Sequence, residues 1–328
     1  MEQQVTAVAH ANVALVKYFG KRDVRLNLPA APSLSLTLKP LQTTTKLMFS
    51  NDKADVVIAN GVAADEKFAG RICSFLHLFR QQSGNSQFLT VHTENNFPTA
   101  AGLASSAAGF AALTVGAARL FGLSLSESEL SAWARRGSGS ASRSVCGGIV
   151  HWQRGGSADG SDSFARSILP AGEWDLRILV GVTTRAPKEI GSTSAMEHTR
   201  TTSPYYRAWI DSATAAVDEA IEAVSKKDFE RLGEVTEHSA LSMHASLMAA
   251  QPPIVFLKGA TIDVFHLTRT LRKEGIQAYF TCDAGPQPKI LCQGKDANAV
   301  EARLRACSGV VDVIHCSLGE GAGLQTPE

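Results

Sequence analysis

Apolar residues in the first third of the chain fall mostly into short runs rich in Val, Leu, Thr and Phe, a pattern that predicts β-strands. The predicted strands span residues 13–18, 34–38, 43–49, 56–59 and 88–93. Before the last of them, five large apolar residues recur every three or four positions, with charged residues between. They are Phe68, Ile72, Phe75, Leu76 and Phe79. This period predicts an amphipathic helix over residues 64–82 that packs on a sheet.

The next predicted helix, residues 105–121, is built almost wholly of small and apolar residues. A helix without a polar face is buried on all sides. Gly122 can end it, and Ser124 or Ser126 can cap a short helix that runs through Arg136. Strands are predicted to follow at 148–153 and 176–184.

The pattern changes near residue 185, after which longer helical periods alternate with short apolar runs. Helices are predicted at 208–225, 228–238, 262–273 and 297–306. Strands are predicted at 278–283, 289–293 and 310–315. We therefore expect an α+β protein of two lobes, spanning residues 1–185 and 186–328.

Charge and composition narrow the function classes. The 328 residues carry 32 Lys and Arg against 31 Asp and Glu, so the net charge of +1 gives no overall attraction to nucleic acid or to an anionic membrane. Six cysteines are scattered without C-x-x-C spacing, which favours buried thiols in a reducing compartment over a zinc site. No signal peptide and no membrane-spanning run is evident. We expect a cytoplasmic protein that binds neither nucleic acid nor membrane.

The most informative chemical feature is the small-residue loop that leads into the helix at 105–121. It contains Gly102, and Ser105 and Ser106 follow at the start of the helix. Backbone amides at a helix N-terminus, together with two hydroxyls, suit phosphate oxygens and a bound Mg²⁺. Neither G-x-x-x-x-G-K-[ST] nor a G-x-G-x-x-G after a strand is present, which argues against P-loop and dinucleotide-binding proteins. The alternative is a closely packed helix that Ser105 merely caps.

Three further clusters carry candidate chemistry. Residues 137–144 place hydroxyls and exposed amides around Arg143, whose guanidinium suits a carboxylate or a phosphate. Residues 17–23 end a strand with two lysines and a tyrosine, and Asp283 ends another strand before a Gly-Pro turn. Each cluster also has an explanation without any chemistry. Residues 137–144 could be a flexible loop, residues 17–23 a basic turn, and the segment after Asp283 a tight turn.

Together these segments resemble mevalonate diphosphate decarboxylase, a family of the GHMP kinase superfamily. The resemblance rests on motifs that run in order along the chain. They are Lys17-Tyr18-x-Gly20-Lys21-Arg22-Asp23, Pro32-Ser33-Leu34-Ser35, residues 96–110, Gly137-Ser138-Gly139-Ser140-Ala141-x-Arg143-Ser144, Lys188-x-x-Gly191-Ser192-Thr193-x-x-Met196, Met243-His244-Ala245 and Asp283-Ala284-Gly285-Pro286.

The resemblance implies a GHMP kinase fold, with an N-terminal lobe of the ribosomal-protein-S5-like type, a second α+β lobe and a substrate cleft between them. It assigns catalysis to Asp283, Lys17 and Arg143. It assigns substrate binding to Tyr18, Lys21, Ser138, Ser140 and Ser192, and the ATP phosphate loop to Gly102, Ser105 and Ser106. ATP and Mg²⁺ are the implied cofactors, with Mg²⁺ held on the ATP phosphates and Ser106 as a candidate ligand. A homodimer is also implied.

The implied activity is ATP-dependent decarboxylation of mevalonate 5-diphosphate in isoprenoid biosynthesis. Asp283 would accept the proton of the tertiary hydroxyl, and Lys17 would keep that carboxylate ionised. Three alternatives remain open at this point. They are a decarboxylase of mevalonate 5-phosphate, a small-molecule kinase of the same superfamily that stops after phosphorylation, and a catalytically silent nucleotide-binding regulator.

Overall fold

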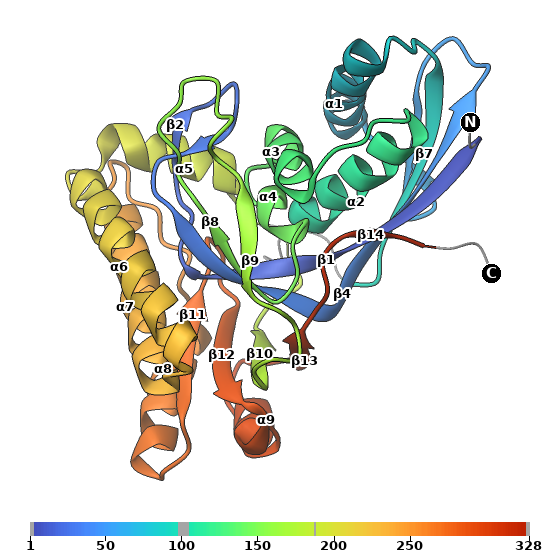
Figure 1. Cartoon of the computed structure of the whole chain (residues 1–328). Helices are drawn as coiled ribbons and strands as arrows, with labels where there is room; N and C mark the ends of the chain where they lie inside the picture. Colours follow the sequence, from blue (N-terminus) through green and yellow to red (C-terminus); the bar gives the residue numbers. More distant parts are fainter. Residues whose placement is uncertain (1–2, 98–104, 187, 326–328) are drawn as a thin grey trace.

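The computed structural model describes residues 3–97, 105–186 and 188–325 of the chain. Within these residues twelve strands form one sheet, whose main path runs β11-β12-β10-β13-β4-β7-β5-β6. The strands of this path are β4 (Ser33–Ser50), β5 (Val56–Ala59), β6 (Val62–Ala63), β7 (Phe88–Asn95), β10 (Leu176–Val182), β11 (Ala278–Cys282), β12 (Pro288–Gln293) and β13 (Asp312–Leu318). One continuous sheet therefore joins the two lobes (Figure 1).

Four strands branch from this path, and a small hairpin stands apart. β1 (Gln4–Val16) pairs antiparallel with almost the full length of β4 and with β14 (Gly323–Leu324) near the chain end. β8 (Ile149–Trp152) pairs with the first residues of β4 and with β9 (Ala165–Leu169). β2 (Lys21–Asp23) and β3 (Leu28–Pro29) form the hairpin. β4 is thus the strand on which both lobes are assembled.

The N-terminal lobe has a layer of helices, of which α2 (Ser105–Leu120) packs directly on β1, β4 and β7. The others are α1 (Glu66–Ser83), α3 (Glu127–Gly137) and the short α4 (Ala141–Ser144). Asp65 caps α1, and Ser126 forms a capping box with Glu129 at the start of α3. The small side chains of α2 allow it to lie directly against the two central strands, in a core that includes Ala7, Leu47 and Ala112.

The helices of the second lobe cover both faces of its part of the sheet, except α5 (Ser192–Thr202), which contacts α7 (Phe229–Met248). The others are α6 (Tyr206–Lys226), α8 (Gly259–Lys273) and α9 (Ala297–Arg305). β10 shows why two layers form. Ile178 and Val180 contribute to the core with α6 and α7, whereas Leu179 between them contributes to the core with α8 and α9. A strand that is apolar at successive positions needs cover on both faces.

Most predicted elements are confirmed, with differences at their ends. The predicted strands 34–38 and 43–49 are two parts of the single strand β4. The helix predicted at 228–238 continues to Met248 as α7, because apolar residues such as Met243 and Leu247 extend the buried face. Two helices, α4 and α5, and the strands β2, β3, β6, β9 and β14 were not predicted. The division at residue 185 stays a prediction. β10 ends before that residue, yet it pairs with β12 and β13, which follow it in the chain.

Within residues 3–97, 105–186 and 188–325, no helix is long and apolar enough to cross a bilayer.

Candidate active site

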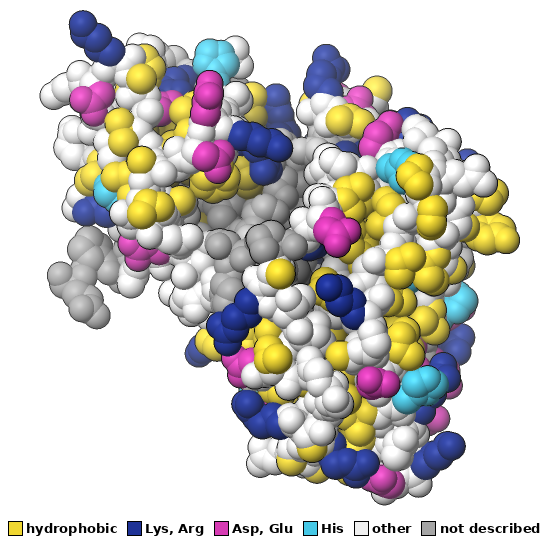
Figure 2. All heavy atoms as spheres, turned by 180° about the vertical axis from the view of Figure 1, so that it is seen from behind, with side chains coloured by type: hydrophobic (Ala, Val, Ile, Leu, Met, Phe, Trp, Pro, Cys, Tyr) yellow, Lys and Arg dark blue, Asp and Glu magenta, His cyan; other side chains and the backbone are white. Residues whose placement is uncertain are grey.

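A cleft with a volume of about 1050 Å³ is lined by residues from both lobes. Figure 2 shows the hollow between the lobes from behind, with Lys and Arg side chains on its rim. The N-terminal lobe contributes residues that follow β1 and residues of α1, α2 and the turn before α4, and the second lobe contributes the start of α5 and the end of β11. Three of the candidate residues come together here, because Lys17, Arg143 and Asp283 all line this cleft.

Asp283 directly follows β11, and its side chain is 28% exposed at the cleft wall. Its Oδ1 accepts a hydrogen bond from Lys17 Nζ at 2.7 Å, and its Oδ2 lies 3.0 Å from Lys289 Nζ. Burial alone would raise the pKa of this carboxyl, but the two ammonium groups outweigh burial and hold the pKa well below its ordinary value. Asp283 is therefore a carboxylate at any physiological pH.

Lys17 is placed by the end of β1. The strand stops at Val16, and the lysine side chain that follows is only 1% exposed. Its Nζ also donates to the carbonyl of Ala14 at 2.7 Å, while its backbone N–H donates to Ser239 Oγ of α7 at 3.0 Å. Burial lowers the pKa of the Lys17 ammonium, and Asp283 opposes that change. The two lobes are thus joined at the candidate catalytic pair.

Arg143 lies on α4 and lines the cleft, although most of its surface is buried. Its Nε and one terminal nitrogen donate to Asn12 Oδ1 at 3.1 and 2.9 Å, and the other terminal nitrogen donates to Ser33 Oγ at 3.2 Å. The guanidinium also lies 5.6 Å from the ring centre of Tyr18 and 5.7 Å from that of Trp152. Burial lowers the pKa of Arg143 to about 10, which leaves it protonated near neutral pH. A fixed cation is therefore available for an anionic group.

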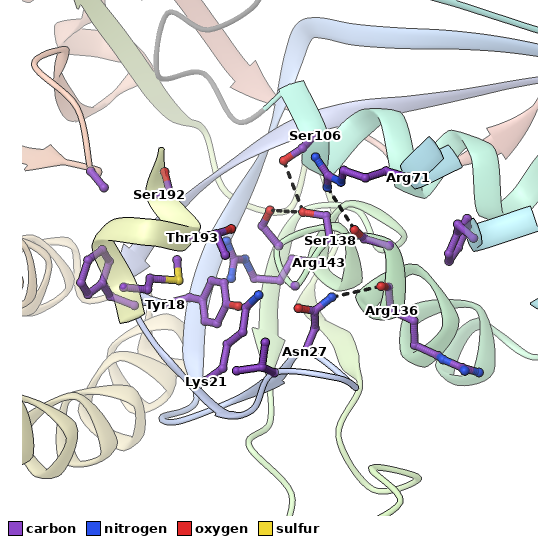
Figure 3. Close-up of a pocket in the computed structure, with 18 of the residues that line it drawn as sticks. Tyr18, Lys21, Asn27, Arg71, Ser106, Arg136, Ser138, Arg143, Ser192 and Thr193 are labelled. Atoms are coloured by element: carbon purple, nitrogen blue, oxygen red, sulfur yellow. Dashed lines mark hydrogen bonds between the residues drawn. The ribbon is translucent and has the colours of Figure 1, made fainter. Parts of the chain in front are cut away.

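A row of hydroxyls crosses the N-terminal wall of the cleft (Figure 3). Ser106 Oγ lies 3.3 Å from Ser138 Oγ, which lies 3.4 Å from Ser140 Oγ. Arg71 of α1 donates to the carbonyl of Gly137 at 3.3 Å, close to Ser138. The lining residues do not include Ser105, although it begins α2. Gly102 lies outside the described residues.

The second lobe supplies a lysine and a serine to the facing wall. Lys188 Nζ donates to Ser192 Oγ at 3.1 Å and to the carbonyl of Ala284 at 2.7 Å. Ser192 is the first residue of α5, so its hydroxyl lies at a helix N-terminus (Figure 3). Burial lowers the pKa of Lys188, and it also lowers the pKa of Lys21 on the opposite wall, where Arg71 adds to the effect. These cations favour an anion between them.

Among the described lining residues, eight carry positive charge and two carry negative charge. The cations are Lys17, Lys21, Arg25, Lys67, Arg71, Arg136, Arg143 and Lys188, and the acids are Glu66 and Asp283. Such an excess fits ligands with several phosphate or carboxylate groups. Across the described ranges, no group of three or more His, Cys, Asp or Glu side chains is arranged to hold a metal ion. Ser106, the candidate Mg²⁺ ligand, lines the same cleft.

Sequence reasoning missed three residues that shape this site. Asn12 orients Arg143, Lys289 contacts Asp283, and Lys188 was noted only as part of a motif. A signal existed for two of them, because Asn12 and Lys289 are polar residues inside apolar strands, where a polar side chain needs a buried partner. Lys188 lies in a loop, and nothing in the local pattern pointed to its contacts.

Two lobes joined by one sheet, with a cleft rich in Lys and Arg between them, make this an α+β protein of the GHMP kinase fold. Residues 9–165 match the diphosphomevalonate decarboxylase-like N-terminal domain, and residues 178–321 match the mevalonate 5-diphosphate decarboxylase C-terminal domain. The chain belongs to the diphosphomevalonate decarboxylase family.

Relatives in sequence and in structure span nearly the whole chain. The diphosphomevalonate decarboxylase of Aspergillus fumigatus is 38% identical over 93% of this chain and 81% of its own length. The human diphosphomevalonate decarboxylase is 38% identical over 87% of this chain and 76% of its own length. A structure of MDDEF in complex with MVAPP, AMPPCP and magnesium has a TM-score of 0.91 at 38% identity, and mevalonate diphosphate decarboxylase from Staphylococcus aureus has one of 0.93 at 35% identity. Both alignments cover 99% of each chain.

Proposed function

We propose that this protein catalyses the ATP-dependent decarboxylation of mevalonate 5-diphosphate to isopentenyl diphosphate, with release of ADP, phosphate and CO₂. The observation that carries the proposal is the placement of Asp283, Lys17 and Arg143 around one cation-rich cleft. A relative of the same fold, 38% identical, has been solved with MVAPP, AMPPCP and magnesium. The substrate and the ATP analogue of that complex point to mevalonate 5-diphosphate and ATP as the pair to test here.

The first step is phosphorylation of the tertiary hydroxyl. Asp283 accepts a hydrogen bond from this hydroxyl and orients its oxygen towards the γ-phosphorus of ATP. As the new O–P bond forms and the P–O bond to ADP breaks, the hydroxyl proton becomes acidic and passes to the carboxylate. A carboxylate of low pKa suffices because phosphoryl transfer needs positioning and charge stabilisation more than a strong base. Bound Mg²⁺ supplies charge neutralisation on the phosphates.

The second step is elimination. The C3–O bond breaks, the phosphate leaves with the electron pair, and positive character develops at C3. The bond between the carboxylate carbon and C2 then breaks, its electrons form the C2–C3 double bond, and CO₂ departs. Arg143, fixed by Asn12 and Ser33, holds the substrate carboxylate in line with the leaving phosphate. Its role is orientation, because a grip that stabilised the ground state alone would not accelerate this step.

Substrate selection belongs to the remaining polar residues of the cleft. Tyr18, Lys21, Ser138, Ser140 and Ser192 all line it, and we assign the hydroxyls of Ser138 and Ser140 to the carboxylate end of the substrate. We assign the distal phosphates to Lys21 and Ser192, where a helix N-terminus adds backbone donors. Ser106 and Arg71 line the side assigned to the ATP phosphates.

A product assay tests the proposal. The protein is incubated with Mg²⁺ and ATP plus either mevalonate 5-diphosphate or mevalonate 5-phosphate, and ADP, phosphate and CO₂ are measured together. Equal amounts of all three from the diphosphate support the proposal, whereas ADP without CO₂ indicates a kinase. Turnover of mevalonate 5-phosphate alone would make that compound the substrate. No turnover of either compound would contradict the proposed decarboxylase activity.

Asp283→Ala provides the residue-level test. We expect kcat to fall about a hundredfold or more, because the hydroxyl loses both its orienting group and its proton acceptor. Asp263→Ala changes an exposed aspartate of α8 and should leave kcat unchanged. Near-normal turnover in Asp283→Ala would remove Asp283 from the mechanism.

We also propose that the protein works as a homodimer in the cytoplasm. The dimer follows from the family resemblance, and light scattering on the purified protein measures it directly. The compartment is supported by the cysteines, since all six are free thiols and a reducing environment keeps them so. Cell fractionation followed by immunodetection tests the location.

A further inference from the structure

Lys289 on β12 forms the second contact of Asp283. Its side chain is only 2% exposed, and its Nζ lies 3.0 Å from Asp283 Oδ2. The same Nζ donates to the carbonyl of Gln287 at 3.4 Å. Lys289 is not among the described residues that line the cleft. Of the two residues, Asp283 is the one that lines the cleft and can contact a substrate there.

The two lysines bind different oxygens of one carboxylate. Lys17 Nζ donates to Oδ1 from the end of β1, and Lys289 Nζ pairs with Oδ2 from β12. Rotation of a carboxylate about its last torsion is otherwise broad and nearly two-fold. One ion pair leaves that rotation free, whereas a partner on each oxygen fixes the plane of the group. The carboxylate is then held in one orientation before a substrate arrives.

The buried cluster around Asp283 carries more positive than negative charge. Two ammonium groups share one carboxylate, so this buried cluster has excess positive charge, which is costly without an anion. The titratable and charged groups that influence Asp283 come from six parts of the fold. They are Lys17 after β1, Arg143 on α4, Lys188 before α5, His244 on α7, Cys282 at the end of β11 and Lys289 on β12. The anionic substrate and nucleotide can offset this excess when they bind.

We propose that Lys289 is a positioning residue that, together with Lys17, holds Asp283 ionised and in a fixed orientation for the phosphoryl-transfer step. Only the expected effect of Lys289 on the kinetics rests on the proposed function. The structural consequence, the anchoring of the Asp283 carboxylate, exists in the protein without substrate. The two consequences can therefore be measured separately.

The first experiment is a ¹³C NMR titration of the aspartate carboxyl carbons in the substrate-free, full-length protein, with the Asp283 signal assigned from Asp283→Asn. In the unaltered protein this carboxyl should stay ionised to the lowest pH at which the chain is folded. In Lys289→Met, which retains an unbranched apolar stem, the pKa of Asp283 should rise by about 1 to 3 pH units. Lys289→Gln should give the same rise, so the test stands even if one of the two variants fails to fold.

Lys295→Met is the matched control. Lys295 is exposed and follows the same strand, so its loss should leave the titration of Asp283 unchanged. An unchanged Asp283 titration in both Lys289 variants would overturn the proposal, whatever happens to activity. Because no substrate is present, this result does not depend on whether the decarboxylase assignment is correct.

Kinetics supply the second readout. In Lys289→Met we expect kcat near pH 7 to fall about tenfold or more, with the KM for ATP little changed, because the lysine acts through Asp283 and not through a ligand. The acid limb of kcat/KM should move to higher pH. A residue that served only packing would lower stability without moving this limb, and that outcome would also reject the positioning role.

Discussion

His244 on α7 is a buried titratable residue next to the candidate catalytic pair. Its side chain is 1% exposed, and burial together with the nearby Lys17 lowers its pKa from 6.5 to about 4. As the pH falls below 6.5, the unfolded chain takes up a proton that the folded protein still excludes, so the free energy of unfolding must fall. One pH unit of difference is worth about 1.4 kcal/mol, so we expect this histidine to cost about 3 kcal/mol of stability between pH 7 and pH 4.

Urea unfolding at a series of pH values checks this expectation. His244→Gln should remove the contribution, so its stability should decline less on acidification than that of the unaltered protein. His77→Gln replaces an exposed histidine of α1 and should follow the unaltered protein. Parallel curves for His244→Gln and the unaltered protein would show that His244 does not titrate in this way.

Residues with a chemical motif around them could be predicted, and residues defined only by their partners could not. Asp283, Lys17 and Arg143 were expected to converge, and they line one cleft. The contact between Lys289 and Asp283 depends on the pairing of β11 with β12, which places the two side chains together. A single sequence does not reveal which strands pair, so it could not assign Lys289 to the site.

At the scale of elements, α7 illustrates how closely a helix must approach the sheet. Gly233 faces the ring of Tyr279 on β11, and a Cβ at this position would overlap that ring. The ring cannot move freely, since it is 3% exposed and packs against Phe229 with 5.5 Å between ring centres. Gly233→Ala should therefore destabilise the protein by about 1–3 kcal/mol, despite the better helix propensity of Ala.

Gly70→Ala is the matched control for this prediction. Gly70 also lies inside a helix, α1, but a Cβ there would meet nothing within 4 Å. Relief of the glycine penalty should then stabilise the protein by up to about 1 kcal/mol. Urea unfolding should give opposite signs for the two variants, and the same sign for both would contradict the packing account.

Helical period and strand composition located most elements, but their extent was set by contacts outside the local pattern. β4 was expected as two strands because Lys39 and Pro40 interrupt the apolar run. The strand continues through them because β1 pairs with it on both sides of the interruption. α5 carries few apolar residues and lies beside the cleft, so its sequence has little of the period by which a helix is recognised.

At the scale of the whole molecule, the end of the chain returns to the N-terminal lobe and contacts the segment that carries Arg143. After β13, Gly319 N donates to the carbonyl of Thr37 at 2.8 Å, and Ala322 N donates to that of Val145 at 3.0 Å. β14 then pairs with β1 (Figure 1). The last strands of the second lobe are therefore linked to the turn that places Arg143, two residues before Val145.

Gly321 is the point where this contact is tightest, because a Cβ there would lie 2.5 Å from the carbonyl oxygen of Val145. Gly321→Ala should push the two backbone segments apart, destabilise the protein by about 1–3 kcal/mol and lower kcat/KM about tenfold as Arg143 shifts. Gly323→Ala, two residues further on, meets nothing within 4 Å and should stay within about 0.5 kcal/mol of the unaltered protein. Urea unfolding and steady-state kinetics measure both effects. If Gly321→Ala lost stability but kept full activity, the chain end would support the fold without positioning Arg143.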